Sequence, residues 1–110
     1  MTEAQESSTG TIRDGGVLRI EAKEVFDISV ASELHREFRQ AIEDSLSVEI
    51  DASMIRRIDA SALQLLTALV QDVQARDRQV SWVEPTQEFI YSAELLGLSL
   101  LLELPEAVTA

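Results

Sequence analysis

His35 is the only histidine of this 110-residue chain, and cysteine is absent. Enzymes that attack a substrate through a nucleophile pair a serine or cysteine with a base, most often histidine, which a third group orients. His35 falls in the middle of a predicted helix, between Leu34 and Arg36, where a surface position is the simplest interpretation. The residue types therefore favour no catalytic set built around a histidine or a thiol.

Three carboxylates, Asp27, Asp51 and Asp59, lie near the ends of predicted strands or helices. A calcium loop needs a dense run of Asp or Asn ligands closed by Glu, and no such run surrounds them. A phosphoacceptor receiver domain would need clustered acids and a late lysine, yet the only lysine is Lys23. Gly15-Gly16 lacks the GK[ST] sequence of a phosphate-binding loop. We expect no metal site, no cofactor and no enzymatic activity.

The charge of the chain restricts its partners. There are 20 acidic and 9 basic residues, which gives a net charge of −11. A chain this acidic is repelled by nucleic acid and by anionic membranes, so we expect neither partner. No signal peptide and no run of 18 apolar residues is present, and the absence of cysteine fits a reducing compartment. The expected location is the cytoplasm, without insertion into a membrane.

The pattern of residues predicts a short disordered segment followed by one domain. Residues 1–10 are small and polar, which is typical of a frayed terminus, and the 45% hydrophobic content of the whole chain is that of a packed domain, placed in residues 11–110. A strand at Thr11 to Arg13, a turn at Asp14-Gly15-Gly16 and a strand at Val17 to Ala22 predict a β-hairpin.

After the hairpin, two segments have apolar residues at helical spacing. Asp27 or Ser29 is the predicted cap of the first helix. Its stripe of apolar residues contains Ala31, Leu34, Phe38, Ala41, Ile42 and Ser45-Leu46. After a strand at Val48 to Ala52 and a loop from Ser53 to Ile58, a second stripe contains Ala62, Leu63, Leu66, Leu69, Val70 and Val73. This second helix should end near Arg76.

The last part of the chain repeats this alternation of strand and helix. Val80 to Val83 predicts a strand, Pro85-Thr86 a break and helix cap, and Gly97 the end of a third helix that contains Phe89, Ile90, Ala93 and Leu96. The run from Leu98 to Leu104 fits an edge strand or a short helix, and we predict the strand. Such alternation predicts an α/β fold with a mixed, mostly parallel sheet and helices packed on it.

The segment Ile50 to Leu66, IDASMIRRIDASALQLL, resembles the STAS domain, the sulfate transporter and anti-sigma factor antagonist family. In bacterial anti-sigma factor antagonists the turn before the middle helix typically reads D-S-S-G-L, and Asp59-Ala60-Ser61-Ala62-Leu63 is similar position by position. Ala60 and Ala62 replace the usual Ser and Gly.

The resemblance extends over about 90 residues. Val25-Phe26-Asp27 occupies the place of the family's G-E-L-D strand end, although the glycine is missing, and Asp27 matches its acid. Leu96-Gly97-Leu98 resembles the late S-G-L. The resemblance implies the STAS fold, with the family's last helix missing or vestigial after Pro105.

The resemblance also implies a site. The second serine of the family motif is phosphorylated by a cognate kinase, which would make Ser61 the acceptor here. A helix N-terminus holds a phosphate well, because its backbone N–H groups are unpaired. Asp59 is adequately explained as the N-cap of the helix. As the family's functional acid, it would also orient the Ser61 hydroxyl or help present it to the kinase. Arg56 and Arg57 are either solvated loop charges or contacts for an acidic partner or the phosphate.

Helix geometry adds a strip beside the buried stripe. At about 100° per residue, Ser61, Leu65, Ala68 and Asp72 line up along one side of the helix. The strip is either the edge of the core or a docking patch anchored by Leu65.

Three functions remain open. The favoured one is a non-enzymatic module that binds an anti-sigma factor or serine kinase and releases it when Ser61 is phosphorylated. The alternative is a constitutive STAS subunit of a phospholipid-transport ABC system or chemosensory cluster, which would bind a transporter ATPase or a signalling scaffold. A small-ligand site at the helix start near Ser61 is the third.

Overall fold

The computed structural model of the protein describes residues 9–105. The predicted hairpin is present: β1 (Thr9–Asp14) and β2 (Val17–Ala22) are antiparallel, with Asp14 opposite Val17 across the Gly15-Gly16 turn. Gly15 has a φ of 58°, a left-handed conformation that glycine adopts without a Cβ clash. The strand begins two residues before the predicted Thr11. Disorder was predicted for residues 1–10; residues 1–8 lie outside the described residues, whereas Thr9 and Gly10 belong to β1.

The predicted mixed, mostly parallel sheet is confirmed. β4 (Ser47–Asp51) pairs in parallel with β2 and with β6 (Val80–Val83), which gives the order β1-β2-β4-β6. Along β2, Leu18, Ile20 and Ala22 are buried whereas Arg19 and Glu21 are exposed, because successive strand residues point to opposite faces. The sheet thus has one apolar face and one polar face.

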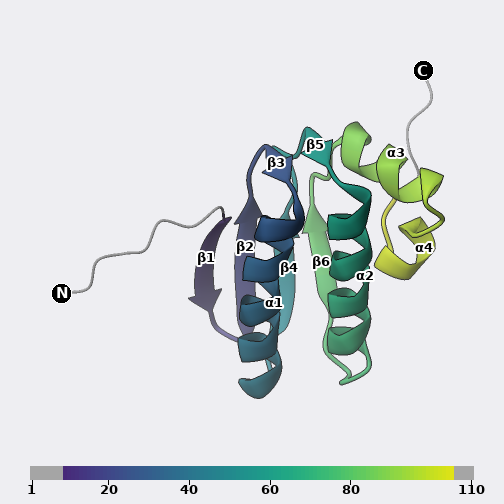
Figure 1. The fold of residues 1–110 in the computed structure, drawn as a ribbon. Helices are drawn as coiled ribbons and strands as arrows, with labels where there is room; N and C mark the ends of the chain where they lie inside the picture. The colour runs from purple at the N-terminus through teal and green to yellow at the C-terminus, as the bar shows by residue number, and fades with distance from the viewer. Residues whose placement is uncertain (1–8, 106–110) are drawn as a thin grey trace.

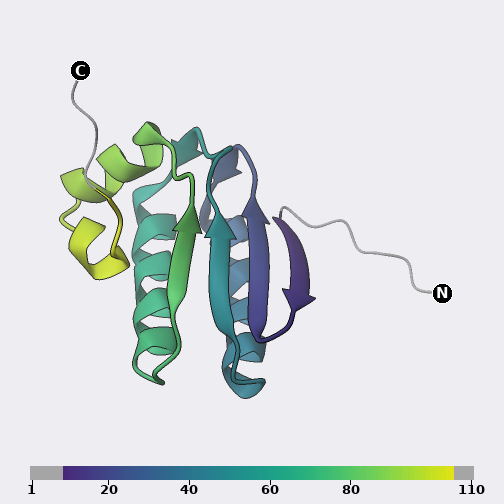
Figure 2. The ribbon, with the colours of Figure 1, turned by 180° about the vertical axis from the view of Figure 1, so that it is seen from behind.

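Two long helices cover the apolar face. α1 (Ile28–Glu43) and α2 (Ala60–Gln74) lie side by side in front of the sheet in Figure 1. The view from behind shows strands with no described helix over them (Figure 2). Every residue of the second predicted stripe is buried. In the first, Ala31, Leu34, Phe38 and Ala41 are buried and Ile42 is half-buried, whereas Ser45-Leu46 lies beyond the end of α1. The core therefore lies between these helices and one side of the sheet.

Two short strands that the sequence did not predict as separate elements join at the upper end of the molecule in Figure 1. β3 (Val25–Phe26) pairs in parallel with β5 (Arg57–Ile58). The sequence analysis placed Val25–Phe26 at the end of the second strand and Ser53 to Ile58 in a loop. A strand of two residues is too short to show alternating apolar and polar side chains, so the sequence pattern does not predict it.

The predicted third helix is present as α3 (Gln87–Leu95), capped by Thr86. Gly97, at a φ of 71°, follows its C-cap, and the N–H of Leu98 bonds to the carbonyl oxygen of Ala93 at 2.8 Å. Leu96, which was predicted to be on the buried stripe, is 40% exposed.

The prediction of a last strand was wrong. Ser99–Leu102 forms a one-turn helix, α4, which packs against α2 and α3. Leu102 is fully buried, whereas Leu100 and Leu101 are exposed. The segment contains leucine and no β-branched residue, so its propensity favours a helix, and its burial does not alternate as in a strand. Within the described chain, no helix has the length and apolarity needed to cross a membrane.

Candidate functional site

The N-termini of α1 and α2 are held next to each other by the β3–β5 pair. Phe26 is in register with Ile58, and the N–H of Asp59 donates to the carbonyl oxygen of Phe26 at 3.1 Å. Asp27 and Asp59 follow these paired strands, and each is the N-cap of the helix that comes next. The structure therefore brings together two acids that are 32 residues apart in the sequence.

Asp27 caps α1 as predicted. Its Oδ1 accepts hydrogen bonds from the Ser29 hydroxyl at 2.8 Å and from the backbone N–H groups of Ser29 at 3.1 Å and Val30 at 3.2 Å. These bonds favour the ionised carboxylate, the Ser29 hydroxyl contributing most, and they lower the pKa of Asp27 below its ordinary value. Asp27 was predicted to bind a partner, and one of its two carboxylate oxygens is thus already used to cap α1.

Asp59 differs from Asp27 although both are N-cap residues. Its backbone has the extended conformation of an N-cap, but its side chain makes no capping hydrogen bond and is exposed. Its carbonyl oxygen still accepts the first bond of the helix, from Leu63 N–H at 3.0 Å. The Asp59 carboxylate is therefore open to solvent beside the first turn of α2.

Ser61 is the second residue of α2 and is exposed. Ser29 holds the same position in α1, but its hydroxyl is bonded to Asp27. In the described part of the chain, no hydrogen bond occupies the Ser61 hydroxyl. The two helix starts, D-I-S and D-A-S, thus also differ in their serines: the serine of α2 is available to an external group.

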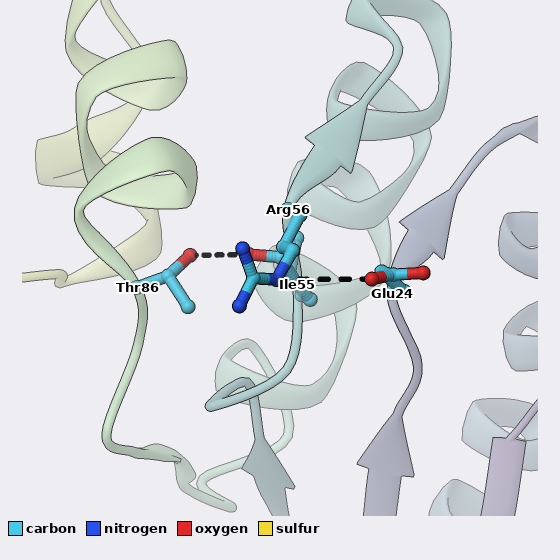
Figure 3. Close-up of polar contacts among 4 residues, drawn as sticks. All are labelled: Glu24, Ile55, Arg56 and Thr86. Atoms are coloured by element: carbon cyan, nitrogen blue, oxygen red, sulfur yellow. Dashed lines mark hydrogen bonds and ion pairs between the residues drawn. The ribbon is translucent and has the colours of Figure 1, made fainter.

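The loop before Ser61 is tied down on two sides (Figure 3). On one side, Thr86 Oγ1 donates to the carbonyl oxygen of Ile55 at 2.7 Å and also accepts from Phe89 N–H at 3.2 Å. On the other, the N–H groups of Arg56 and Arg57 donate to the carbonyl oxygen of Glu24 at 2.8 and 3.1 Å. Thr86 was predicted only as a helix cap; its second bond also positions the loop.

Arg56 and Arg57 are both exposed. Arg56 Nε lies 3.7 Å from Glu24 Oε2, and both side chains are well over half exposed, so water screens this ion pair strongly. No ion pair of Arg57 is present among the described residues. The loop thus carries two accessible cations next to the start of α2.

The strip along α2 is largely accessible. Ser61, Ala68 and Asp72 are exposed, and Leu65 is half-buried against the core. Asp72 Oδ1 lies 3.6 Å from Arg76 Nε one turn further on. The strip spans about 16 Å from Ser61 to Asp72, at a rise of about 1.5 Å per residue. The first turn of α2 and the arginine loop form one compact group, and Ala68 and Asp72 extend it.

An apolar surface on α3 and α4 was not predicted from the sequence. Its members are large apolar side chains with 40–89% exposure: Tyr91, Leu95, Leu96, Leu100 and Leu101. An open groove of about 190 Å³ separates α3 from the start of α2, lined by Ile58, Ala60, Leu63, Ser92, Leu95 and Leu96. Consecutive Leu95-Leu96 and Leu100-Leu101 were the available signal, because adjacent helix positions cannot all face one core.

Asp51, another of the acids near a strand end, has a structural role. Asp51 Oδ1 accepts from the N–H and the hydroxyl of Ser53 at 3.0 and 2.6 Å, so it holds the turn after β4. No cluster of three or more His, Cys, Asp or Glu residues within the described range is arranged to hold a metal ion. His35 is exposed on α1, away from the start of α2 in sequence.

The described chain is an α/β domain with two long helices on one face of its sheet and an exposed serine in the first turn of α2. The family described as "Mlab, STAS domain" matches residues 10–103. The chain belongs to the STAS domain family.

Solved structures show the same fold. SpoIIAA, an anti-sigma factor antagonist in its unphosphorylated form, has a TM-score of 0.73 and 12% identity over 91% of this chain and 88% of its own. An anti-sigma factor antagonist from Mycobacterium paratuberculosis has a TM-score of 0.70 and 20% identity, over 92% of this chain and 85% of its own.

A third structure, described as "Crystal Structure Analysis of Mglu", has a TM-score of 0.62 and 18% identity over 69% of this chain. The present chain spans only 19% of that one. No curated protein sequence matches this chain. The anti-sigma factor antagonists therefore share the α/β architecture described above across nearly the whole chain.

Proposed function

We propose that this protein is a non-enzymatic, cytoplasmic binding module whose partner, an anti-sigma factor or serine kinase, is released when Ser61 is phosphorylated. The observation that carries the proposal is the exposed Ser61 hydroxyl in the first turn of α2, beside the exposed and uncommitted carboxylate of Asp59. SpoIIAA, which has the same fold, has been solved with and without phosphate.

A phosphate at Ser61 is compatible with the fold. The second residue of a helix lies among backbone N–H groups without intrahelical partners and at the positive end of the helix dipole. Phosphorylation adds a charge of about −1.5 to −2 and three strong acceptor oxygens. Because the hydroxyl is exposed, these oxygens reach solvent and backbone N–H groups without displacing a core residue. The modification therefore changes the surface and leaves the core intact.

The same charge opposes docking of an acidic partner group. At an effective dielectric constant near 20, two unit charges about 4 Å apart interact by roughly 4 kcal/mol. About 1.4 kcal/mol corresponds to a tenfold change in affinity, so half of that repulsion releases a micromolar partner. Asp59 adds a second negative charge on the same side. The unmodified surface, in contrast, offers Arg56 and Arg57 to a partner carboxylate.

The contact surface in this proposal contains the eight residues predicted from the sequence. Leu65 supplies the half-buried apolar anchor, and exposed Ala68 lets a partner approach the helix backbone closely. Asp27 borders the site through the β3–β5 pair. The full set is Asp27, Arg56, Arg57, Asp59, Ser61, Leu65, Ala68 and Asp72.

The experiment combines detection of the phosphate with binding measurements. Mass spectrometry of protein isolated from its native cells should find phosphate on Ser61. Ser61→Ala, Ser61→Asp and Ser81→Asp variants are then used to capture partners from native lysate. Ser81 is exposed on β6, so Ser81→Asp places the same charge on the uncovered side of the sheet. The captured partner is purified and its affinity for each variant is measured.

We expect Ser61→Asp to weaken binding at least about tenfold, while Ser61→Ala and Ser81→Asp bind like the wild type. Equal affinity for all four proteins, without phosphate on Ser61, would overturn the switch. That result would instead support the constitutive subunit of a phospholipid-transport or chemosensory assembly. Loss of binding in both aspartate variants would show only that the partner avoids negative charge anywhere on the domain.

A further inference from the structure

The apolar surface of α3 and α4 is separate from the strip on α2. Leu95 is 70% exposed and Leu100 is 89% exposed, and Tyr91 lies one helical turn before Leu95 on α3. Figure 1 shows α3 and α4 together at the side of the molecule, next to α2. Apolar side chains scattered singly over a surface need no explanation, but five within eleven residues form a patch typical of an interaction site.

The chain segment that forms this patch carries charges of one sign only. From Glu84 to Pro105 the chain contains no Lys, Arg or His, and its charged residues are Glu84, Glu88, Glu94 and Glu103. All four glutamates are exposed. A partner that covers these leucines therefore meets a rim that attracts Lys and Arg and repels Asp and Glu.

We propose that the α3–α4 surface docks a basic amphipathic helix of a partner protein. The apolar face of that helix covers Leu95, Leu100 and Leu101, and its Lys and Arg residues face the glutamate rim. One apolar side chain of the partner enters the groove between α3 and the start of α2. The proposal does not depend on phosphorylation, because none of its residues is among the eight of the Ser61 surface, although Ile58 and Ala60 in the groove wall are their neighbours in the chain.

Charge complementarity favours a basic helix over a second copy of this chain or an anionic membrane. In a two-fold dimer through the same patch, each glutamate rim would face another glutamate rim, between two chains of net charge −11. An anionic membrane would be repelled in the same way. A basic helix instead satisfies the apolar surface and the acidic rim at once.

The test uses two synthetic peptides of about 18 residues, which is five helical turns. They share one leucine face and lack tryptophan; the first carries lysine on its polar face and the second carries glutamate. Trp82 is the only tryptophan of the protein, and its indole N–H bonds to the carbonyl oxygen of Leu102 in α4 at 2.8 Å. Its fluorescence therefore reports docking on this surface, and amide chemical shifts map the contact.

Two double variants separate apolar docking from general attraction to an acidic protein. Leu95→Gln with Leu100→Gln removes two exposed leucines of the patch and leaves every charge in place. Ile28→Gln with Met54→Gln is the matched control, because these side chains are 49% and 61% exposed outside the patch. Far-UV circular dichroism verifies that all variants are folded.

We expect the lysine peptide to bind the wild type and the control variant alike, and the Leu95/Leu100 variant at least about tenfold more weakly. The glutamate peptide should bind at least about tenfold more weakly than the lysine peptide, and salt should weaken binding. Equal binding of the two peptides, or an unchanged affinity of the Leu95/Leu100 variant, would overturn the proposal. Two further measurements test the other occupants. If the wild type dimerises in sedimentation equilibrium and the Leu95/Leu100 variant does not, the patch is an interface with a second copy. If the wild type binds phosphatidylcholine vesicles and this variant does not, the patch contacts a membrane.

Discussion

The backbone N–H of Asp59 donates to the carbonyl oxygen of Phe26 at 3.1 Å, and this bond joins the two helix starts on which the site depends. It extends the β3–β5 pair by one residue, so Asp27 and Asp59 begin neighbouring helices from neighbouring strands. Only Asp27 uses its side chain to cap its helix. The two acids have equivalent positions, but the fold depends on one and leaves the other exposed.

Asp27→Ala should destabilise the domain at neutral pH more than Asp59→Ala, because only Asp27 accepts helix N–H bonds. The pKa of Asp27 is lowered in the folded state, so its stabilising contribution is present above the unfolded pKa and is lost as pH falls through the folded value. Denaturant unfolding at about pH 7 and at about pH 3 measures both variants against the wild type. An Asp27→Ala deficit that grows on acidification would contradict the sign argued here.

Thr86→Val should lower the free energy of unfolding by roughly 1–2 kcal/mol, because it removes the α3 cap and the bond to the Ile55 carbonyl. The matched control is Thr67→Val, since the buried Thr67 hydroxyl donates to a carbonyl oxygen, that of Leu63, within its own helix. Urea denaturation measures both variants, and amide exchange of Arg56 and Arg57 reports the loop. If Thr67→Val costs more than Thr86→Val, the loop contact contributes little.

Ser45→Gly should stabilise the domain by about 1 kcal/mol. Ser45 follows the C-cap of α1 with a φ of 56°, a left-handed conformation that costs a residue with a Cβ about that much. Gly97→Ala provides the opposite test, because Gly97 has a φ of 71° and open space where a Cβ would be. Thermal unfolding should show a higher midpoint for the first variant and a lower one for the second. Shifts in the same direction would rule out backbone conformation as the cause.

Trp82→Phe should cost about 1 kcal/mol or more, because the Leu102 carbonyl loses its indole N–H donor and the ring contact with Phe89, at 5.2 Å between centroids, changes. Hydrogen exchange should accelerate in α4 and remain slow in β2. Tyr91→Phe is the control, since Tyr91 is 59% exposed. Uniform acceleration across the sheet would mean that α4 unfolds only together with the core.

The sequence predicted the elements that have a strong period and missed those that do not. The stripes of α1 and α2 follow the helical repeat because each helix buries a single face. β3, β5 and α4 are set by tertiary contacts: backbone pairing between residues more than 30 positions apart, and the burial of Leu102. Such contacts leave no periodic signal in a segment of two to four residues.

The candidate site was predictable to the level of its helix position. Asp59 as an N-cap position and the exposed strip on α2 followed from spacing and from the family resemblance. That Asp59 lacks a capping bond while Asp27 makes two depends on side-chain rotamers, which spacing does not encode. The second bond of Thr86 and the apolar surface of α3 and α4 depend on how distant segments pack.

Figure 2 shows the side of the sheet that no described helix covers, and β2 carries the polar side chains of Arg19 and Glu21 on that side. Because the chain has no cysteine, a single thiol introduced at exposed Ser81 would be the only one in the molecule. A dye, spin label or solid support attached there leaves α2, α3 and α4 accessible. Position 81 is therefore an attachment site from which both proposed contacts can be measured, because it lies outside both surfaces.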